Sequence, residues 1–346
     1  MHLRRTLLAL TTVAATAAGT VTATAHAAPQ AVPPTPTVTD VLADGIGTPW
    51  GMDFLPDGSA LVTDRDSALV RRVAPDGTVT EVGTVPDVVP EGEGGLLGLA
   101  VSPTYQTDQL VYVYYTAASD NRIARMTYDG TALGEPDVIL SGIDKASIHN
   151  GGRIEFGPDG MLYAGTGDAA NTGNSQDPDS LNGKILRMTP AGGVPADNPT
   201  AGSLVYSMGH RNVQGLAWDP DGRLWASELG QNTWDELNLI EPGANYGWPV
   251  CEGTCGDPQY VEPKATWSPS EASPSGLAYA ENTLWMASLR GQRLWGIPIA
   301  GGEVDGDPVG FFANEHGRLR AIEPAPDGSL WLATNTGGQV LRLTLG

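Results

Sequence analysis

The sequence predicts an all-β fold and, within that class, a six-bladed β-propeller. The 346 residues include 45 glycines and 27 prolines, and these alternate with short runs rich in Val, Leu, Trp and Tyr. That alternation is typical of strands separated by turns. A second observation gives the architecture, because one turn signature, Pro-Asp-Gly between two apolar strands, repeats along the chain.

The repeat has six copies, each with an apolar strand, a tight turn and a second strand that carries bulky side chains. They begin at Gly51, Gly98, Arg153, Gly215, Gly276 and Ala321, with spacings of 47, 55, 62, 61 and 45 residues. One such unit cannot bury both of its faces, whereas radial stacking of four-stranded units of about 40 to 50 residues forms a propeller. The extra length falls in segments 168–184 and 228–262, which we expect to be functional loops at one end of the ring.

The N-terminal region divides into an export signal and a strand that closes the ring. Residues 1–27 combine two arginines, an uncharged stretch and a small-residue cleavage site, which predicts a signal peptide and a secreted protein; a retained membrane anchor is the alternative. Residues 28–43 are predicted as a linker and closing strand, with 37–42 and 339–345 sharing one blade. The propeller domain is expected to occupy 44–346.

Net charge restricts the classes of binding partner, and cysteine content indicates a disulfide. The formal net charge is −21 and becomes −23 once Arg4 and Arg5 leave with the signal peptide, which argues against nucleic acid or an anionic membrane as a partner. Cys251 and Cys255 are the only cysteines. Because an exported chain meets an oxidising compartment, we expect a disulfide between them; the alternative, a metal site, would need further ligands.

Three histidines remain after the signal peptide, His149, His210 and His316, each beside a turn of a different blade. They can meet only near the axis of the ring. A histidine here could be a hydrogen-bonded loop residue, a member of a three-histidine zinc site that lacks the usual ligand spacing, or a catalytic base. A base needs an acidic partner, and Asp168 supplies it, because a hairpin can return the chain beside its own start.

Four arginines, Arg211, Arg290, Arg318 and Arg320, fall in loops or turns of the later blades. If they converge, they form a cationic pocket suited to carboxylates or phosphates; taken singly, each could be a solvated surface residue. Alternation within GRLRA places Arg318 and Arg320 on the same side of a strand.

The segment 228–249, ELGQNTWDELNLIEPGANYGWP, interleaves acids and asparagines with glycine. Its backbone carbonyls, with Asp235 and Glu236, are the hard oxygen ligands that calcium prefers. The alternative is an acidic solvated loop, and the spacing matches no EF-hand.

Five motifs in the order HNGGRIEFGPDG, NGKILRM, GHRNVQGLAWDP, DELNLIEPGANYGWP and HGRLRAIEPAPDGSLWLAT closely resemble those of the soluble pyrroloquinoline-quinone (PQQ)-dependent sugar dehydrogenases. These are six-bladed propellers that oxidise aldoses. The resemblance extends from about residue 44 to the C-terminus. Short loops after Asp168 and Pro249 make the chain more similar to the compact aldose sugar dehydrogenase branch than to the longer glucose dehydrogenases.

The resemblance implies two cofactors, PQQ and Ca2+, and a role for each candidate residue. His149 would be the base that removes the anomeric hydroxyl proton, and Asp168 would orient its imidazole. Glu93 would lie on the substrate side, where the glucose dehydrogenases carry glutamine. The implied cofactor contacts are Arg211, Asn212, Arg290, Arg318 and Arg320, with Arg290 in place of the family's lysine. The implied calcium-site residues are Gly230 and Gln231 through their carbonyls, and Asp235, Glu236 and Tyr246.

We therefore predict a secreted quinoprotein that oxidises a small-molecule aldose at the anomeric carbon to a lactone and passes the electrons to an acceptor that the sequence does not identify. One alternative is a calcium-dependent lactone hydrolase of the propeller type, in which the arginine cluster would lack a purpose. The other is a non-catalytic propeller that binds sugar or protein. The presence of His149 and of the arginine pair Arg318 and Arg320 argues against this alternative.

Overall fold

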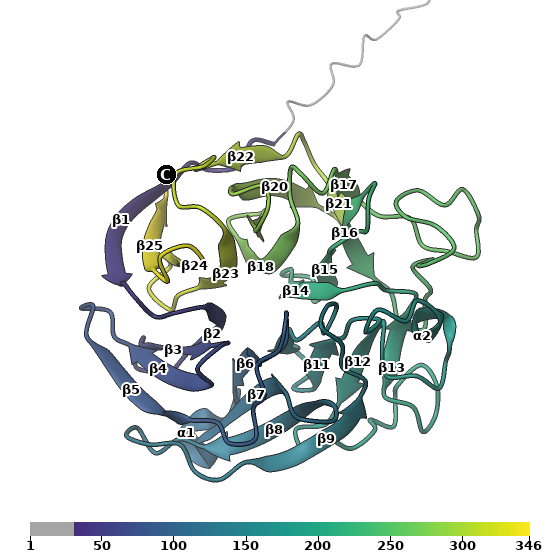
Figure 1. Cartoon of the computed structure of the whole chain (residues 1–346). Coiled ribbons are helices and arrows are strands. Elements are labelled where there is room, and N and C mark those ends of the chain that lie inside the picture. Colours follow the sequence, from purple (N-terminus) through teal and green to yellow (C-terminus); the bar gives the residue numbers. More distant parts are fainter. Residues whose placement is uncertain (1–30) are drawn as a thin grey trace, which may run out of the picture. The chain divides into compact units, whose positions relative to one another are not determined.

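Almost all regular structure in this protein is β-strand. The structure is a computed structural model and describes residues 31–346. Within those residues, helix is limited to two four-residue turns, α1 (Tyr105–Asp108) and α2 (Gly173–Gln176). The strands form six antiparallel sheets that follow one another around a ring (Figure 1). The predicted all-β class and the six-bladed β-propeller are confirmed.

The blades are numbered here in the chain order of their inner strands. Blade 1 is β2 (Pro49–Phe54), β3 (Ala60–Asp64), β4 (Leu69–Val73) and β5 (Val79–Thr84); blade 2 is β6 (Leu96–Val101), β7 (Leu110–Thr116), β8 (Asn121–Thr127) and β9 (Asp137–Ile143); blade 3 is β10 (Ile154–Phe156), β11 (Leu162–Gly165), β12 (Lys184–Met188) and β13 (Val205–Met208). Blade 4 is β14 (Val213–Trp218), β15 (Leu224–Glu228), β16 (Asp235–Ile240) and β17 (Ala265–Trp267); blade 5 is β18 (Pro274–Ala280), β19 (Thr283–Ser288) and β20 (Leu294–Ala300), which pairs with both β21 (Glu303–Val304) and β22 (Val309–Phe311); blade 6 is β23 (Leu319–Pro324), β24 (Leu330–Thr334), β25 (Val340–Leu345) and β1 (Pro36–Ala43).

Blade 6 combines the first and the last strands of the described chain. β1 pairs antiparallel with β25, in a register that sets Thr37 opposite Thr344 and Val41 opposite Leu341. These are the two segments from which ring closure is expected. Because they are hydrogen-bonded within one sheet, the ring cannot open there without breaking that sheet.

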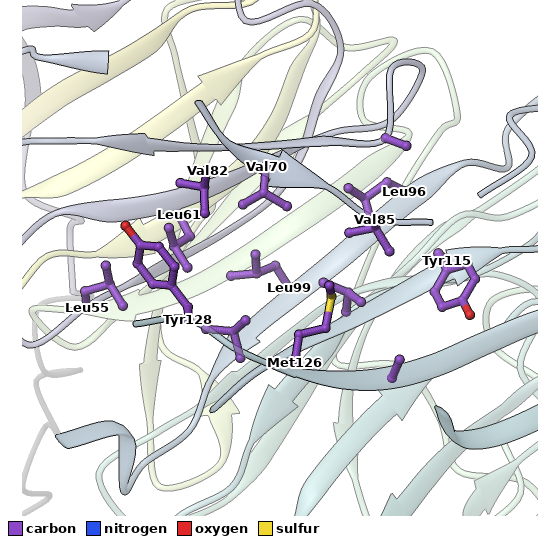
Figure 2. Close-up of a cluster of buried hydrophobic side chains, with 14 of the residues drawn as sticks. Leu55, Leu61, Val70, Val82, Val85, Leu96, Leu99, Tyr115, Met126 and Tyr128 are labelled. Atoms are coloured by element: carbon purple, nitrogen blue, oxygen red, sulfur yellow. The ribbon is translucent and has the colours of Figure 1, made fainter. Parts of the chain in front are cut away.

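Apolar side chains fill the spaces between neighbouring blades. The cluster between blades 1 and 2 contains Leu61, Val70, Leu99 and Met126, with Tyr128 at one end (Figure 2). Alternate residues of a strand point to opposite faces of its sheet, so each blade contributes to two such clusters. The core is therefore a series of layers around the axis, and the axis itself is left to the inner strands.

The inner strands of adjacent blades approach one another closely. Gly51, Gly98, Gly215 and Gly276 begin their repeats, and a Cβ on any of them would lie within 3.0 Å of backbone atoms in the next blade, in its inner strand or, for Gly98, just before it. The six repeats start at equivalent positions, so the six inner strands lie in similar register around the axis. The inner strands consequently begin at one end of the ring, which we call the mouth.

Loops from all six blades converge at the mouth. In each blade the second strand runs antiparallel to the inner strand, so the second strand ends where the inner strand begins. Residues just before each inner strand and just after each second strand thus surround a common space. Glu93, His149 and Arg211 belong to the first group, and Asp168 and Arg290 to the second.

Two further predictions concern the ends and the loops of the chain. Cys251 and Cys255 form a disulfide in the loop between β16 and β17, as expected. The predicted signal peptide, residues 1–27, lies outside the described residues. Between residues 31 and 346, no helix has the length and apolar character needed to cross a membrane.

Replacement of Gly98 by Ala should destabilise the ring. The new methyl group would meet the carbonyl of Gly152 and the backbone nitrogen of Ile154, and such overpacking costs about 1–3 kcal/mol. Urea unfolding should show this loss. Gly173→Ala is the control, because its Cβ would meet only the Asn171 side chain at 3.4 Å. Equal stabilities for the two variants would contradict the assignment of Gly98 as a close contact.

Candidate functional site

A cavity of about 400 Å³ lies at the mouth, among residues from five of the six blades. Four of the residues predicted from the sequence line it, namely Glu93, Arg290, Arg318 and Arg320. The remaining lining residues are Trp50, Arg65, Gln214, Leu229, Ser273, Leu289 and Asn335. The predicted convergence of the late arginines is therefore present in the structure.

The cavity carries positive charge within an acidic protein. Four guanidinium groups line it, and Glu93 is the single carboxylate among the lining residues. Arg320 is buried and donates to Gln214 Oε1 at 2.8 Å and to Asn335 Oδ1 at 3.0 Å. Burial, followed by repulsion from neighbouring arginines, lowers the pKa of Arg320 to about 9. The group still holds its proton at neutral pH, so the cavity favours anions.

His149 and Asp168 form a hydrogen-bonded pair beside this cavity. His149 Nδ1 lies 2.7 Å from Asp168 Oδ1. The imidazole retains 13% of its exposure, whereas the carboxylate is fully buried. His149 precedes β10 and Asp168 follows β11, so the antiparallel pairing of these strands brings the two residues together, as the sequence predicts.

Asp168 is held in its ionised form. Burial favours the neutral acid, but hydrogen bonds from His149, from Trp248 Nε1 at 2.9 Å and from Ala170 N at 2.8 Å hold the pKa of Asp168 below its ordinary value. An ionised carboxylate accepts a proton donor, which assigns the hydrogen of the neutral imidazole to Nδ1. Nε2 of His149 is then the nitrogen with a free lone pair.

Arg211 joins the imidazole to blade 4. One terminal nitrogen donates to His149 Nε2 at 2.8 Å, and the other donates to the Leu229 carbonyl at 2.9 Å. The guanidinium lies over the Trp248 ring at 5.4 Å, and its buried Nε has no hydrogen-bond partner within residues 31–346. Arg211 is thus placed between the base and the cavity wall at Leu229.

Glu93 contacts the backbone of His149. Its Oε2 accepts a hydrogen bond from the His149 amide at 2.9 Å, and His149 has φ 58°. This left-handed conformation is uncommon for a residue with a side chain. Glu93 therefore fixes the base as well as lining the cavity, a contact that the sequence does not predict.

Asn212 lies outside the cavity wall. It is buried, its Oδ1 accepts from Gly151 N at 2.9 Å, and its backbone forms a β-bridge with Gly167. It therefore ties blade 4 to both ends of the hairpin that carries His149 and Asp168. A direct contact of Asn212 with a ligand in the cavity stays a prediction.

The acidic residues predicted near a calcium ion are occupied by backbone amides. Asp235 accepts from Gly230 N at 2.8 Å and from Ser273 N at 2.6 Å. Glu236 accepts from Gly253 N at 2.7 Å. Burial raises the pKa of Asp235 to about 6 and that of Glu236 to about 8.

The other predicted calcium-site residues differ in whether their oxygen atoms already form hydrogen bonds. The Tyr246 hydroxyl donates to the Leu239 carbonyl at 2.7 Å and accepts from Glu241 N at 2.8 Å. In the described part of the chain, the carbonyl oxygens of Gly230 and Gln231 accept no hydrogen bond. Of the predicted set, these two carbonyls alone carry no hydrogen bond within residues 31–346.

The three-histidine zinc site is wrong. His210 is fully buried between Ser207 Oγ and Glu228 Oε2, each at 2.8 Å, and His316 packs against Phe312. Neither side chain joins His149. Among residues 31–346, no three His, Cys, Asp or Glu side chains are grouped to hold a metal ion.

Arg65, Asn335 and Trp248 belong to the site but were not predicted from the sequence. The repeat nevertheless indicates where the first two of them lie. A Thr or Ser lies at the end of each second strand or one residue from it, and cavity residues follow it by one or two positions, as Arg65 follows Thr63 and Asn335 follows Thr334. The phase of the repeat could thus have located these two. Trp248, by contrast, reaches Asp168 across 80 residues of chain, and no periodicity indicates that contact.

Charged residues also lie on the inner strands, near the Trp50 wall of the cavity. Arg153 stacks on the Trp50 ring at 4.8 Å, and its two terminal nitrogens have no hydrogen-bond partner within the described residues. Burial raises the pKa of Asp53 to about 6 and raises the pKa values of Glu155 and Glu323 well above their ordinary range. Mutual repulsion among these carboxylates adds to the effect, and Arg153 offsets part of it.

Fold and site together define a six-bladed propeller with an imidazole–carboxylate pair at its mouth, beside a cavity for an anionic ligand. The family model described as glucose/sorbosone dehydrogenase matches residues 46–342. This chain belongs to that family.

Solved and curated relatives agree in fold and extent. The PQQ-bound form of aldose sugar dehydrogenase from Streptomyces coelicolor is 54% identical, with a TM-score of 0.89, over 91% of this chain and 100% of that one. The aldose sugar dehydrogenase of Escherichia coli is 29% identical over 90% of this chain and 94% of its own length. Quinoprotein glucose dehydrogenase B of Acinetobacter calcoaceticus is 33% identical over 64% of this chain and 54% of its own.

Replacement of Glu155 by Gln should make the stability of the protein fall less steeply as the pH rises. The folded-state pKa of Glu155 lies above its unfolded value, so the wild-type protein loses stability as pH rises from the unfolded value towards the folded one. Glutamine removes this loss. Thermal melts should show the melting temperature of the variant rising relative to that of the wild type as the pH increases above the ordinary carboxyl range. Glu135→Gln, an exposed position, is the control; a constant difference between the melting temperatures of Glu155→Gln and wild type would contradict the raised pKa.

Proposed function

We propose that this protein is a PQQ-dependent aldose sugar dehydrogenase that oxidises the anomeric carbon of an aldose to a lactone. The observation that carries the proposal is the pair of His149 and Asp168 beside a cavity lined by four arginines. The names of the relatives supply the cofactor and the substrate class. Residues 1–27 support export of the enzyme, and the electron acceptor is a separate molecule.

The cavity residues fit PQQ, a planar tricarboxylate. Arg290, Arg318 and Arg320 would hold its carboxylates, since guanidinium groups bind carboxylates through paired hydrogen bonds. Arg211, whose buried Nε lacks a partner among residues 31–346, would add a further contact. Bound PQQ would supply a two-electron oxidant that takes the hydride of the anomeric carbon.

His149 would act as the general base. Asp168 holds the proton of the imidazole on Nδ1, so Nε2 is available for the proton of the anomeric hydroxyl, and the carboxylate stabilises the imidazolium that forms. Arg211 now donates to Nε2, and its guanidinium would have to turn away before a hydroxyl could bind there. Glu93 would keep the base in place and, as a carboxylate at the cavity wall, accept a hydrogen bond from a sugar hydroxyl.

Calcium would bind at the carbonyl oxygens of Gly230 and Gln231. These carbonyls have no hydrogen-bond donor within the described chain, and carbonyl oxygen is a ligand that calcium accepts. Asp235 would act by holding Gly230 N, and Glu236 and Tyr246 by fixing the surrounding loop. A calcium ion there would supply a Lewis acid for the cofactor.

The sugar-facing rim differs from that implied for glucose dehydrogenases. Ile148, immediately before the base, is 42% exposed, where the resemblance implies a polar residue. An apolar side chain there offers no hydrogen bond to a sugar hydroxyl. Together with Glu93 in place of glutamine, it supports a preference among aldoses that differs from a preference for glucose.

His149→Ala should abolish sugar oxidation but preserve cofactor binding. Loss of the general base should lower kcat by about 10²- to 10⁴-fold, whereas the arginines of the cavity stay in place. Dye reduction with an aldose measures the first effect, and titration with PQQ measures the second. His316→Ala is the control, because its ring packs against Phe312. Unchanged turnover in His149→Ala would overturn the base assignment.

Activity should require both PQQ and calcium. Apo-protein supplied with both should reduce a dye in the presence of an aldose, and omission of PQQ or addition of a chelator should remove the activity. A panel of aldoses then ranks the substrates. Lactone hydrolysis without PQQ would favour a calcium-dependent hydrolase instead. No dye reduction with any aldose, together with saccharide binding, would favour a non-catalytic propeller.

A further inference from the structure

A second cavity, of about 330 Å³, lies between blades 1 and 2. Blade 1 contributes the turn after β2, including Asp57, and Arg72 on β4; blade 2 contributes α1 and the turn after β8. The turn after an inner strand lies at the opposite end of the ring from the mouth. This cavity is therefore separate from the site of His149, and its volume falls within the range of about 300–1,000 Å³ typical of small-molecule sites.

The walls of this cavity are fixed by contacts of their own. Gln109 ends α1 with φ 53°, and its carbonyl accepts from Tyr128 N at 2.8 Å. The Tyr105 hydroxyl donates to the Tyr128 carbonyl at 2.7 Å. Leu55 and Tyr128 belong to the apolar cluster between the two blades (Figure 2). The cavity is thus preformed rather than a gap between mobile loops.

Its lining combines an aromatic face with polar groups that have spare hydrogen-bonding capacity. The Tyr105 ring is half-buried and packs on the cluster between the blades. Gln106 and Gln109 line the cavity with exposed side-chain amides. Asp129 engages only Oδ1, leaving Oδ2 open.

The charges of the cavity select the class of ligand. Arg72 is paired with Asp57 at 2.7 Å. Asp129 forms no salt bridge within residues 31–346 and adds a negative charge, because a hydrogen bond from the Thr131 side chain lowers its pKa to about 2. Anions are therefore disfavoured. A purely apolar ligand would leave polar side chains of the lining without hydrogen-bond partners. These side chains are Asp57, Arg72, Gln106, Gln109 and Asp129. A neutral molecule with many hydroxyls and an apolar ring face meets both conditions.

We propose that the cavity between blades 1 and 2 is a non-catalytic binding site for a neutral saccharide. One face of a sugar ring would lie on Tyr105, and its hydroxyls would bond to Gln106, Gln109 and Asp129 Oδ2. The proposal is independent of the chemistry at the mouth. It gives the enzyme a means of remaining on a glycan while the mouth acts on free sugar.

Methyl glycosides of neutral trisaccharides test the proposal on the holoenzyme. A methyl glycoside lacks the anomeric hydroxyl, so it is not oxidised at the mouth and reports binding alone. We expect saturation-transfer NMR and calorimetry to detect binding of at least one malto-, cello- or xylotrioside, and to detect none of the methyl trigalacturonide, which is anionic. Binding of free aldose at the mouth is followed separately by dye reduction.

The variant Gln106→Ala/Gln109→Gly removes both amides at exposed positions, and glycine suits the positive φ of residue 109. It should weaken trisaccharide binding at least tenfold and leave the rate of aldose oxidation unchanged. Tyr105→Leu should have a similar effect through loss of the aromatic face. Gln259→Ala, at an exposed position elsewhere, should bind as the wild type does.

Three results would overturn the proposal: no neutral trisaccharide binds, binding persists in Gln106→Ala/Gln109→Gly, or Gln259→Ala weakens it equally. Persistent binding that a free aldose substrate displaces would place the saccharide at the mouth. None of these results bears on aldose oxidation, so failure here and failure of the proposed function are distinguishable.

Discussion

Close contact between the inner strands of neighbouring blades is the constraint on which this structure depends. Gly51, Gly98, Gly215 and Gly276 permit that contact, because any side chain there would collide with the backbone of the next blade. The contact sets the radius of the ring at its axis. That radius in turn determines how near the loops of different blades come at the mouth, and hence the size of the cavity.

Blades 3 and 6 lack this glycine, and blade 3 shows how the protein accommodates a large residue in its place. Arg153 stands at the position that is glycine in four blades, and its Nε donates to the Gln214 carbonyl of blade 4 at 2.9 Å. Its guanidinium stacks on Trp50, the ring over which Arg320 also lies, at 5.6 Å. Two arginines thus share one indole that lines the cavity. Carboxylates two positions further along the repeat, in blades 1, 3 and 6, offset the buried charge of Arg153: Asp53, Glu155 and Glu323.

The features that depend on the spacing of the repeat and on local hairpins could be predicted from the sequence. The spacing of the repeat gave the blade number, and the β10–β11 hairpin gave the pair of His149 and Asp168. Contacts between blades were not predictable, because nothing in a single sequence specifies which loops meet. Arg211 reaches His149 across 62 residues of chain. For the residues predicted near calcium, the sequence could not tell that Asp235 and Glu236 already accept hydrogen bonds from backbone amides.

The position of the base depends on three blades at once. Glu93 before blade 2 holds the His149 amide, Asp168 of blade 3 holds Nδ1, and Arg211 before blade 4 reaches Nε2. His149 itself has a left-handed backbone, which costs about 1–3 kcal/mol and persists because surrounding contacts enforce it. A small rotation of one blade against the next would break at least one of these bonds and release that strain. Accurate placement of the imidazole is therefore a property of the packed ring, which explains why a site built from loops needs glycines deep at the axis.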